Sequence, residues 1–288
     1  MANHARTLVK HHGLENVVTV LQCAAEDLQL PEKVDVIISE WMGYFLLRES
    51  MLDSVIKARD TWLKPGGAMF PSHARVLLAP LEGRTGRKKQ DEFADTMDVW
   101  HEFCDITSTK FGVDMNCLTQ PFEQEQKAYY LQTSLWQDVA PSQVLGEPVV
   151  LLSYDLHTVT VADILHPTSE FSLTLSAVSQ VGTVDALCAW FDVDFRGSEA
   201  NPCQERVVLD TAPDEQGSTH WGQQVLYLHP PQPAVPGDVL KGTFAMQRKK
   251  ENHRLMGVQF ALRHGRAEPS RGGALEMGPA RQDTFNVE

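Results

Sequence analysis

The second half of the chain is dominated by short runs in which apolar and polar residues alternate. Turn-forming residues separate seven such runs, at residues 149–157, 171–181, 186–195, 206–211, 224–228, 239–247 and 256–263. Successive side chains of a strand point to opposite faces of a sheet, so this alternation predicts strands with one buried face. Many such strands in succession predict an antiparallel β domain, either a barrel or a sandwich. After Gly265 the periodicity weakens, and we expect that tail to fray unless it pairs with the sheet.

The residues up to about Pro71 follow a different pattern, that of an α/β unit. The first ten residues predict a helix that Gly13 ends, and a β-branched run at 17–22 predicts a strand. The run at 34–39 is almost entirely apolar, as expected of a central parallel strand covered on both faces. Apolar residues then recur at helical spacing over 51–63. This region is predicted to be the later part of a doubly wound sheet domain.

The elements expected at the start of such a domain are missing from the sequence. No G-x-G-x-x-G or similar loop precedes the strands, so we expect the first βαβ piece to be absent from this chain. Residues 64–67 are expected to end the helix, and residues 74–80 and 91–103 predict a strand and another helix. Residues 112–142 are too long for a simple connection and too aromatic for a disordered linker. We expect them to pack on another subunit.

Composition limits the classes of protein that the chain can belong to. Its 288 residues, 42% of them apolar, suffice for about two domains. The 25 basic and 38 acidic residues give a net charge of −13, which argues against direct nucleic-acid binding and favours a basic partner. The five cysteines include no C-x-x-C pair and the histidines no H-E-x-x-H, so we expect no metal site. The sequence has neither a membrane-length apolar run nor a signal peptide, and we expect a soluble protein of the cytoplasm, the nucleus or both.

The most informative segment is SEWMGYFLLRESM, at residues 39–51, between the apolar run and the following helix. It places Glu40 at the carboxyl end of a strand, where open α/β sheets bind ligands, and Glu49 at a helix N-terminus. Two carboxylates in one pocket repel each other unless a cation lies between them, and a guanidinium suits paired carboxylates well. Equally, Glu40 could cap the strand end and Glu49 belong to a helix-capping arrangement. The residues alone leave both interpretations open.

The segment at 39–51 resembles the double-glutamate loop of the protein arginine methyltransferases, and Thr219-His220-Trp221 resembles their T-H-W loop. The similarity covers essentially the whole chain. Leu46-Leu47-Arg48 and residues 71–75 look most like the plant subgroup numbered ten, a type I branch that makes asymmetric dimethylarginine. We call residues 39–51 the double-glutamate loop and residues 219–221 the T-H-W loop.

The resemblance implies a fold and a domain division. Residues 1–72 would be the C-terminal part of a Rossmann-like, S-adenosylmethionine-dependent methyltransferase domain. Residues 73–288 would be an antiparallel β-barrel domain that binds the substrate, with a helical dimerisation arm inserted at 112–142. The implied partners are a second copy of the chain and proteins that present arginine in basic or glycine/arginine-rich segments, such as histones. Arg271-Gly272-Gly273 resembles such a segment, which suggests self-methylation.

The resemblance also implies which residues would bind the arginine. Glu40 and Glu49 would hold the guanidinium, and His220 would shape the acceptor side of the pocket. Either Glu49 or His220 would take the proton that the guanidinium loses. Tyr44 and Trp221 would form aromatic walls for the cation. The alternative for these two aromatic residues is ordinary core packing.

On the donor side, the resemblance assigns three residues to S-adenosylmethionine. Glu26 matches the acidic residue that binds the adenine amino group, with the backbone of Ala25 beside it, and Met51 matches a methionine that lines the donor pocket. Without the resemblance, Glu26 would be a solvated loop residue and Met51 a core-facing one.

The family's glycine-rich loop, its ribose-binding acid and its N-terminal helix would all precede Met1. We therefore expect this polypeptide to bind the donor weakly or not at all. The alternative function is a non-catalytic module that pairs with another subunit.

Overall fold

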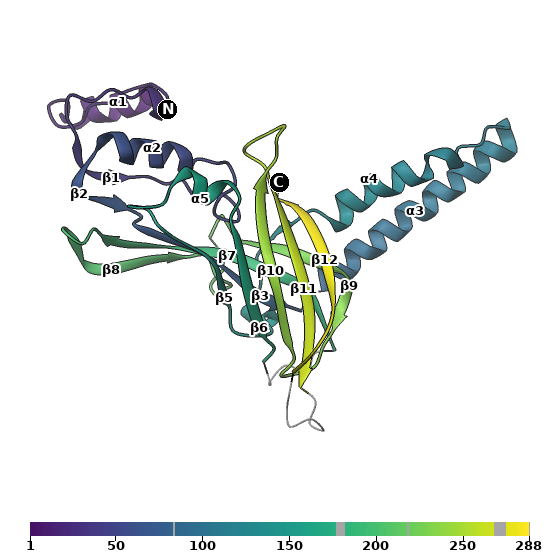
Figure 1. Ribbon diagram of the computed structural model, residues 1–288. Coiled ribbons are helices and arrows are strands. Elements are labelled where there is room, and N and C mark those ends of the chain that lie inside the picture. The colour runs from purple at the N-terminus through teal and green to yellow at the C-terminus, as the bar shows by residue number, and fades with distance from the viewer. Residues whose placement is uncertain (83, 177–181, 218, 268–274, 288) are drawn as a thin grey trace.

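The computed structural model describes residues 1–82, 84–176, 182–217, 219–267 and 275–287. Arg271-Gly272-Gly273 lies outside these residues. Two helices and a small sheet form one side of the molecule, two larger antiparallel sheets form its centre, and a long helical hairpin projects from the opposite side (Figure 1). None of the described helices is long and apolar enough to cross a membrane. Within the described ranges, His, Cys, Asp and Glu side chains form no cluster suited to a metal ion.

The N-terminal region contains a helix, a two-stranded parallel sheet and a second helix. The elements are α1 (Ala2–His11), the 3₁₀ turn η1 (Ala25–Asp27), β1 (Val34–Ile38), α2 (Leu52–Trp62) and β2 (Leu63–Phe70). β1 and β2 pair in parallel, with Val36 opposite Ala68. The expected helices at the start of the chain and before residue 64 are confirmed, as is the parallel strand that precedes the double-glutamate loop.

Two expectations for this region are wrong. Residues 17–22 have irregular backbone rather than forming a strand, and Val17 is 79% exposed. A strand needs a neighbour for its hydrogen bonds, and the described sheet here consists of β1 and β2 alone. β1 is not covered on both faces, because Ile38 is 78% exposed. The helix ends at Trp62, before residues 64–67, as expected, and these four residues lie inside β2.

The centre of the molecule consists of two antiparallel sheets, as the alternating pattern predicted. The four-stranded sheet has the order β12-β11-β10-β6, and the six-stranded sheet has the order β4-β9-β7-β3-β5, with β8 paired to β7. The strands are β3 (His73–Leu81), β4 (Leu135–Gln137), β5 (Val149–Asp155), β6 (Thr168–Thr174), β7 (Thr183–Gly197), β8 (Pro202–Asp210), β9 (Gln223–Pro233), β10 (Val239–Arg248), β11 (Met256–Ala267) and β12 (Leu275–Val287). The hydrogen bonds of the described strands do not close these sheets into one barrel. The tail does pair with the sheet, since β12 lies along β11 from Leu275 to Val287.

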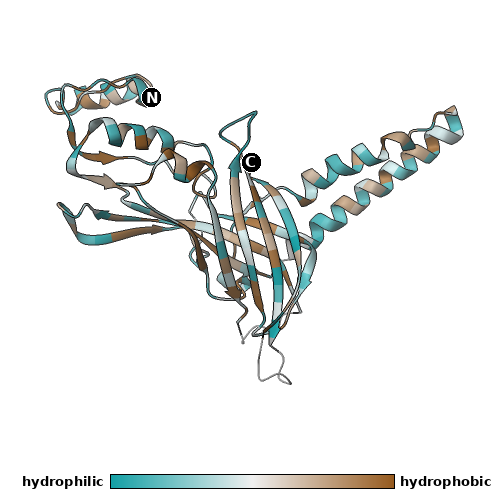
Figure 2. Ribbon diagram, in the orientation of Figure 1, coloured by the Kyte–Doolittle hydropathy of each residue, from teal (hydrophilic) through white to brown (hydrophobic). Residues whose placement is uncertain are grey.

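One hydrophobic core joins the two sheets to the double-glutamate loop. The brown, hydrophobic residues run along the strands of both sheets in Figure 2. Phe45 of the loop stacks on Phe244 of β10, with ring centroids 5.9 Å apart, and Phe244 in turn packs on Phe260 of β11. The apolar part of the loop is therefore held by the β sheets.

The projecting hairpin consists of α3 (Arg84–Phe111) and α4 (Thr119–Leu131). Trp100 of α3 stacks on Phe122 of α4 with centroids 4.4 Å apart, and its Nε1 donates a 2.9 Å hydrogen bond to Thr119 Oγ1. α3 is longer than the expected helix at 91–103, so the hairpin begins before residue 112. The remaining helical segments are η2 (Asn116–Leu118), η3 (Pro141–Gln143) and α5 (Val161–Leu165).

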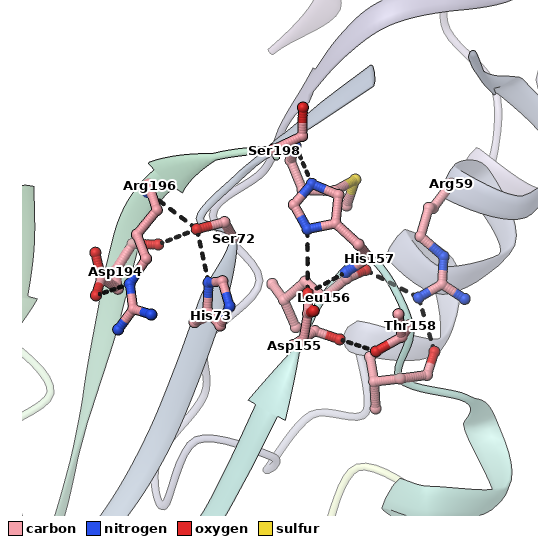
Figure 3. A network of polar contacts seen from close by, with 12 residues as sticks. Arg59, Ser72, His73, Asp155, Leu156, His157, Thr158, Asp194, Arg196 and Ser198 are labelled. Carbon is pink, nitrogen blue, oxygen red and sulfur yellow. Dashed lines mark hydrogen bonds and ion pairs between the residues drawn. The ribbon is translucent and has the colours of Figure 1, made fainter. Parts of the chain in front are cut away.

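Polar contacts fasten the N-terminal region to the six-stranded sheet (Figure 3). The buried guanidinium of Arg59, on α2, donates hydrogen bonds to the carbonyl oxygens of Leu156 (2.9 Å) and Val159 (2.7 Å). The backbone N–H of Met69, on β2, lies 3.3 Å from Nε2 of His157. Because these groups follow β5 directly, they orient α2 and the preceding double-glutamate loop relative to the sheet.

Candidate active site

The double-glutamate loop is a tight, irregular turn with a buried apolar interior. Its backbone N–H of Gly43 donates a 3.0 Å hydrogen bond to the carbonyl oxygen of Leu46. Phe45 (φ 53°) and Leu46 (φ 64°) adopt the left-handed conformation, which side chains other than glycine rarely occupy, and both are buried in the core. Burial of these side chains offsets the backbone strain. The two carboxylates, at the ends of the loop, stay exposed.

The structure brings the T-H-W loop against the double-glutamate loop. The indole Nε1 of Trp221 donates a 2.8 Å hydrogen bond to the carbonyl oxygen of Met42. The ring of Trp221 packs edge-on against Phe191 of β7 and also lies 3.7 Å, centroid to centroid, from the ring of His220. His220 itself is exposed. The two motifs, far apart in the sequence, are therefore in contact, and at this contact Trp221 is buried and His220 is exposed.

Glu49 is in contact with two guanidinium groups of the chain itself. Nη2 of Arg254 donates a 2.5 Å hydrogen bond to its Oε2, and Nη1 of Arg48 lies 3.7 Å from its Oε1. The guanidinium of Arg48 also lies over the ring of Tyr44, 5.4 Å from its centroid. The Glu49 carboxylate is thus placed to accept hydrogen bonds from a guanidinium, and Tyr44 is placed to contact one. Among the described residues no hydrogen bond joins Glu40 to Glu49 or to His220.

The three residues assigned to the donor lie at η1 and at the start of α2. Glu26, in η1, accepts a hydrogen bond from the hydroxyl of Ser54 on α2. That hydrogen bond, the largest influence, lowers the pKa of the Glu26 carboxyl below its ordinary value. Ala25 begins η1, and the side chain of Met51 is 49% exposed. An exposed, ionised carboxylate suits the adenine amino group and an exposed thioether suits an apolar part of S-adenosylmethionine, so these residues are compatible with that donor.

Comparison with known proteins agrees with this geometry. Residues 88–266 match the family model described as the arginine methyltransferase oligomerization subdomain. The protein arginine N-methyltransferase PRMT10 of Arabidopsis thaliana is 48% identical over 263 residues, which is 90% of this chain and 67% of that protein. The chain belongs to the protein arginine N-methyltransferase family. PRMT10 of japonica rice is 47% identical over 260 residues, covering 90% of this chain and 68% of the rice protein. These relatives confirm the resemblance to the plant subgroup numbered ten.

Solved structures of this methyltransferase family have the same fold. The crystal structure of Arabidopsis protein arginine methyltransferase 10, described as uniquely open, superposes with a TM-score of 0.93 at 44% identity and covers 100% of this chain and 80% of that one. A heterotetrameric enzyme-prozyme complex of Trypanosoma brucei PRMT1 with AdoHcy has a TM-score of 0.75 at 32% identity, covering 100% of this chain and 78% of that one. The expected fold class, a Rossmann-like methyltransferase region followed by an antiparallel β domain, is confirmed.

Sequence reasoning missed two arginine residues that contact the double-glutamate loop or the helix after it. Arg248 opens the basic run at 248–250, and its partner, Asp53, lies 195 residues away in the sequence. Its Nη1 and Nη2 donate hydrogen bonds of 2.6 Å each to the two carboxylate oxygens of Asp53, and its side chain is 10% exposed. Arg254 carried no signal at all, because its partner Glu49 lies 205 residues away in the sequence.

Proposed function

We propose that this chain holds arginine side chains of protein substrates for methylation by S-adenosylmethionine, with asymmetric dimethylarginine as the final product. The observation that carries the proposal is the hydrogen bond from a guanidinium, that of Arg254, to the exposed carboxylate of Glu49. This carboxylate ends a loop that the Trp221–Met42 hydrogen bond joins to the T-H-W loop. The net charge of −13 favours basic substrates such as histone tails and glycine/arginine-rich segments.

In this proposal, Glu40 and Glu49 bind the guanidinium and orient one terminal nitrogen. A guanidinium is a poor nucleophile, because its electron pairs are delocalised and its pKa is above about 12. Two carboxylates localise the positive charge away from the reacting nitrogen, which then keeps an electron pair for the new N–C bond. The proton that this nitrogen loses passes to Glu49 or to His220. Bound S-adenosylmethionine supplies the electrophilic methyl group.

Variants that keep the shape of the two glutamates but not their charge test this role. Glu40→Gln and Glu49→Gln keep the size of each side chain but remove its negative charge. Each should lower methyl transfer to an arginine peptide by about a hundredfold or more, since a positioned charged group has left the site. Donor binding, measured by calorimetry, should stay unchanged. Glu15→Gln, at an exposed position, is the matched control. Wild-type turnover in both variants would refute the proposed role of the carboxylates.

The donor-binding residues proposed here are Ala25, Glu26 and Met51, and we propose that the 288-residue chain binds the donor only weakly. The small sheet beside these residues has two described strands, and Ile38 on β1 is largely exposed. A cofactor of this size needs most of its surface enclosed. Calorimetric titration of the purified chain should give a dissociation constant well above the micromolar range. A micromolar value would contradict this part of the proposal. If the purified chain binds the donor too weakly for turnover, the Glu→Gln substitutions are made at the matching glutamates of the Arabidopsis relative.

The second proposed function is pairing with another subunit through the hairpin that includes residues 112–142. Val99 and Phe103 of α3 line an apolar hollow of about 460 Å³ together with Trp100 and Phe122. Hydrophobic residues reach the projecting end of the hairpin (Figure 2), where Phe111 is 72% exposed. Exposed apolar surface of this kind is typical of a protein interface. Phe103→Glu should convert a dimer to a monomer in sedimentation velocity, whereas Val207→Glu, on the exposed face of β8, should not. A chain that dimerises without binding the donor would favour the non-catalytic alternative.

A further inference from the structure

The turn between β10 and β11 holds the C-terminal end of the double-glutamate loop by three hydrogen bonds. The backbone N–H of Glu49 donates to the carbonyl oxygen of Arg254 at 2.9 Å, and the hydroxyl of Ser50 donates to the carbonyl oxygen of His253 at 2.5 Å. The third bond is the 2.5 Å contact of the Arg254 guanidinium with Glu49 Oε2. Two consecutive residues of the loop are thus bound by two consecutive residues of the turn.

These hydrogen bonds act on backbone that is strained. Glu49 (φ 80°) and Ser50 (φ 59°) both have left-handed conformations, although neither is a glycine. Such conformations persist where surrounding contacts hold them, and they concentrate at functional sites. The paired hydrogen bonds between Arg248 and Asp53 fasten the first turn of α2 to the end of β10, next to the same turn. The β domain therefore holds the backbone of the double-glutamate loop at Glu49, the second of its two glutamates.

The side chain of Arg254 restricts the carboxylate itself. It binds Oε2 of Glu49, while Arg48 faces Oε1 from 3.7 Å and is held over the ring of Tyr44. An ionised carboxylate has about four acceptor positions, so one hydrogen bond to Arg254 leaves positions free for a substrate guanidinium. A glutamate with no such partner samples several rotamers and must lose that freedom when it binds substrate. Arg254 removes that freedom beforehand, which is how positioned groups contribute to binding and catalysis.

We propose that Arg254 is a positioning residue for Glu49: it orients the carboxylate for the substrate guanidinium without contacting the reacting atoms. This inference rests on the proposed role of Glu49 in holding arginine. The opposite relationship would be competition, in which Arg254 occupies the place of the substrate guanidinium. The hydrogen bonds from the Glu49 N–H and the Ser50 hydroxyl to carbonyl oxygens of the turn favour positioning, because they bind the turn to the loop independently of the arginine side chain.

Steady-state kinetics with an arginine peptide and saturating S-adenosylmethionine separate these relationships. Arg254→Ala should lower kcat/KM by about ten- to a hundredfold, with a higher KM, since the free carboxylate must be ordered by the substrate. Arg254→Lys, which keeps the charge but not the planar guanidinium, should recover part of the loss. Lys250→Ala removes a positive charge from the same turn and should stay within twofold of the wild type. An unchanged kcat/KM, or a lower KM, in Arg254→Ala would overturn the inference.

Glu49→Gln is assayed in the same series. It distinguishes failure of the positioning role of Arg254 from failure of the proposed function of Glu49. If Glu49→Gln is fully active, the proposed function of the carboxylate is wrong. If Glu49→Gln is inactive while Arg254→Ala has wild-type kinetics, only the positioning role is wrong.

Hydrogen exchange of the unliganded chain gives a second test that needs no turnover. Peptides that cover residues 44–51 should exchange at least ten times faster in Arg254→Ala than in the wild type or in Lys250→Ala. Arg254→Lys should lie between them, and peptides from β7 should be unaffected, which shows that the variant is folded. Wild-type exchange of the loop in Arg254→Ala would contradict the positioning role.

Discussion

The indole Nε1–H of Trp221 donates a 2.8 Å hydrogen bond to the backbone carbonyl oxygen of Met42, 179 residues away in the sequence. Trp221 is buried, so water does not replace this bond when it is lost. The bond joins the T-H-W loop of the β domain to the double-glutamate loop of the methyltransferase region. Each loop therefore fixes the position of the other, and the arrangement of Glu49 and His220 depends on both.

Trp221→Phe keeps an aromatic ring at this position but removes the hydrogen-bond donor. The carbonyl oxygen of Met42 would lose its partner, and we expect the free energy of unfolding to fall by about 1–3 kcal/mol. Methyl transfer should fall as well, because the two loops are no longer joined. Urea titration gives the stability change, with Trp62→Phe on α2 as the matched indole-to-phenyl control. Equal midpoints for the two variants would contradict the importance of the bond.

Gly43→Ala should disrupt the double-glutamate loop. A Cβ atom at Gly43 would overlap the backbone carbonyl group of Arg48, which cannot move without opening the turn. We expect a loss of stability of about 1–3 kcal/mol together with loss of arginine-dependent activity. Gly257→Ala, where the nearest atoms would lie 3.9 Å from the new Cβ, is the control. Thermal unfolding followed by circular dichroism measures both changes, and a stable, active Gly43→Ala protein would show that the loop tolerates the side chain.

Arg59→Met should weaken the junction between α2 and the six-stranded sheet. Methionine fills much of the same volume but leaves the carbonyl oxygens of Leu156 and Val159 without their donor. Losing hydrogen bonds to a buried charged group costs about 2–4 kcal/mol. Lys57→Met, at an exposed position of the same helix, should change the unfolding midpoint little. Similar midpoints for the two variants in urea would indicate that the junction does not depend on Arg59.

His229 makes stability depend on pH in a defined window. Burial, and next the positive charge of Arg281, lowers the pKa of His229 from 6.5 to about 4. Between these values the unfolded chain binds a proton that the folded chain does not, so the free energy of unfolding falls as the pH falls from 6.5 towards 4. The contribution is constant above pH 6.5, where both states are neutral.

Urea titrations at pH 7 and pH 5 measure this effect. The wild type should lose more stability between these pH values than His229→Gln, which lacks the titrating ring. His11→Gln, an exposed histidine on α1, should behave like the wild type. If the His229→Gln and wild-type proteins lose the same amount, burial of His229 does not contribute to the pH dependence.

Local pattern was enough to predict most elements and the family. Alternation over residues 149–263 predicted the antiparallel sheets, and the resemblance of residues 39–51 and 219–221 to the loops of the arginine methyltransferases indicated the family. These features succeed because side-chain periodicity and short loops are local properties of the chain. The roles of the site residues remain predictions, to be tested by the variants above.

Contacts between distant segments were decided only by the tertiary structure. Residues 17–22 have the composition of a strand but no strand beside them, whereas the weakly periodic residues 275–287 form β12 because β11 offers them a partner. Likewise, Arg254 meets Glu49, and Trp221 meets Met42, only when β10, β11 and the loops are packed together. A strand or an ion pair needs a neighbour in space, and sequence spacing carries no information about a neighbour 205 residues away.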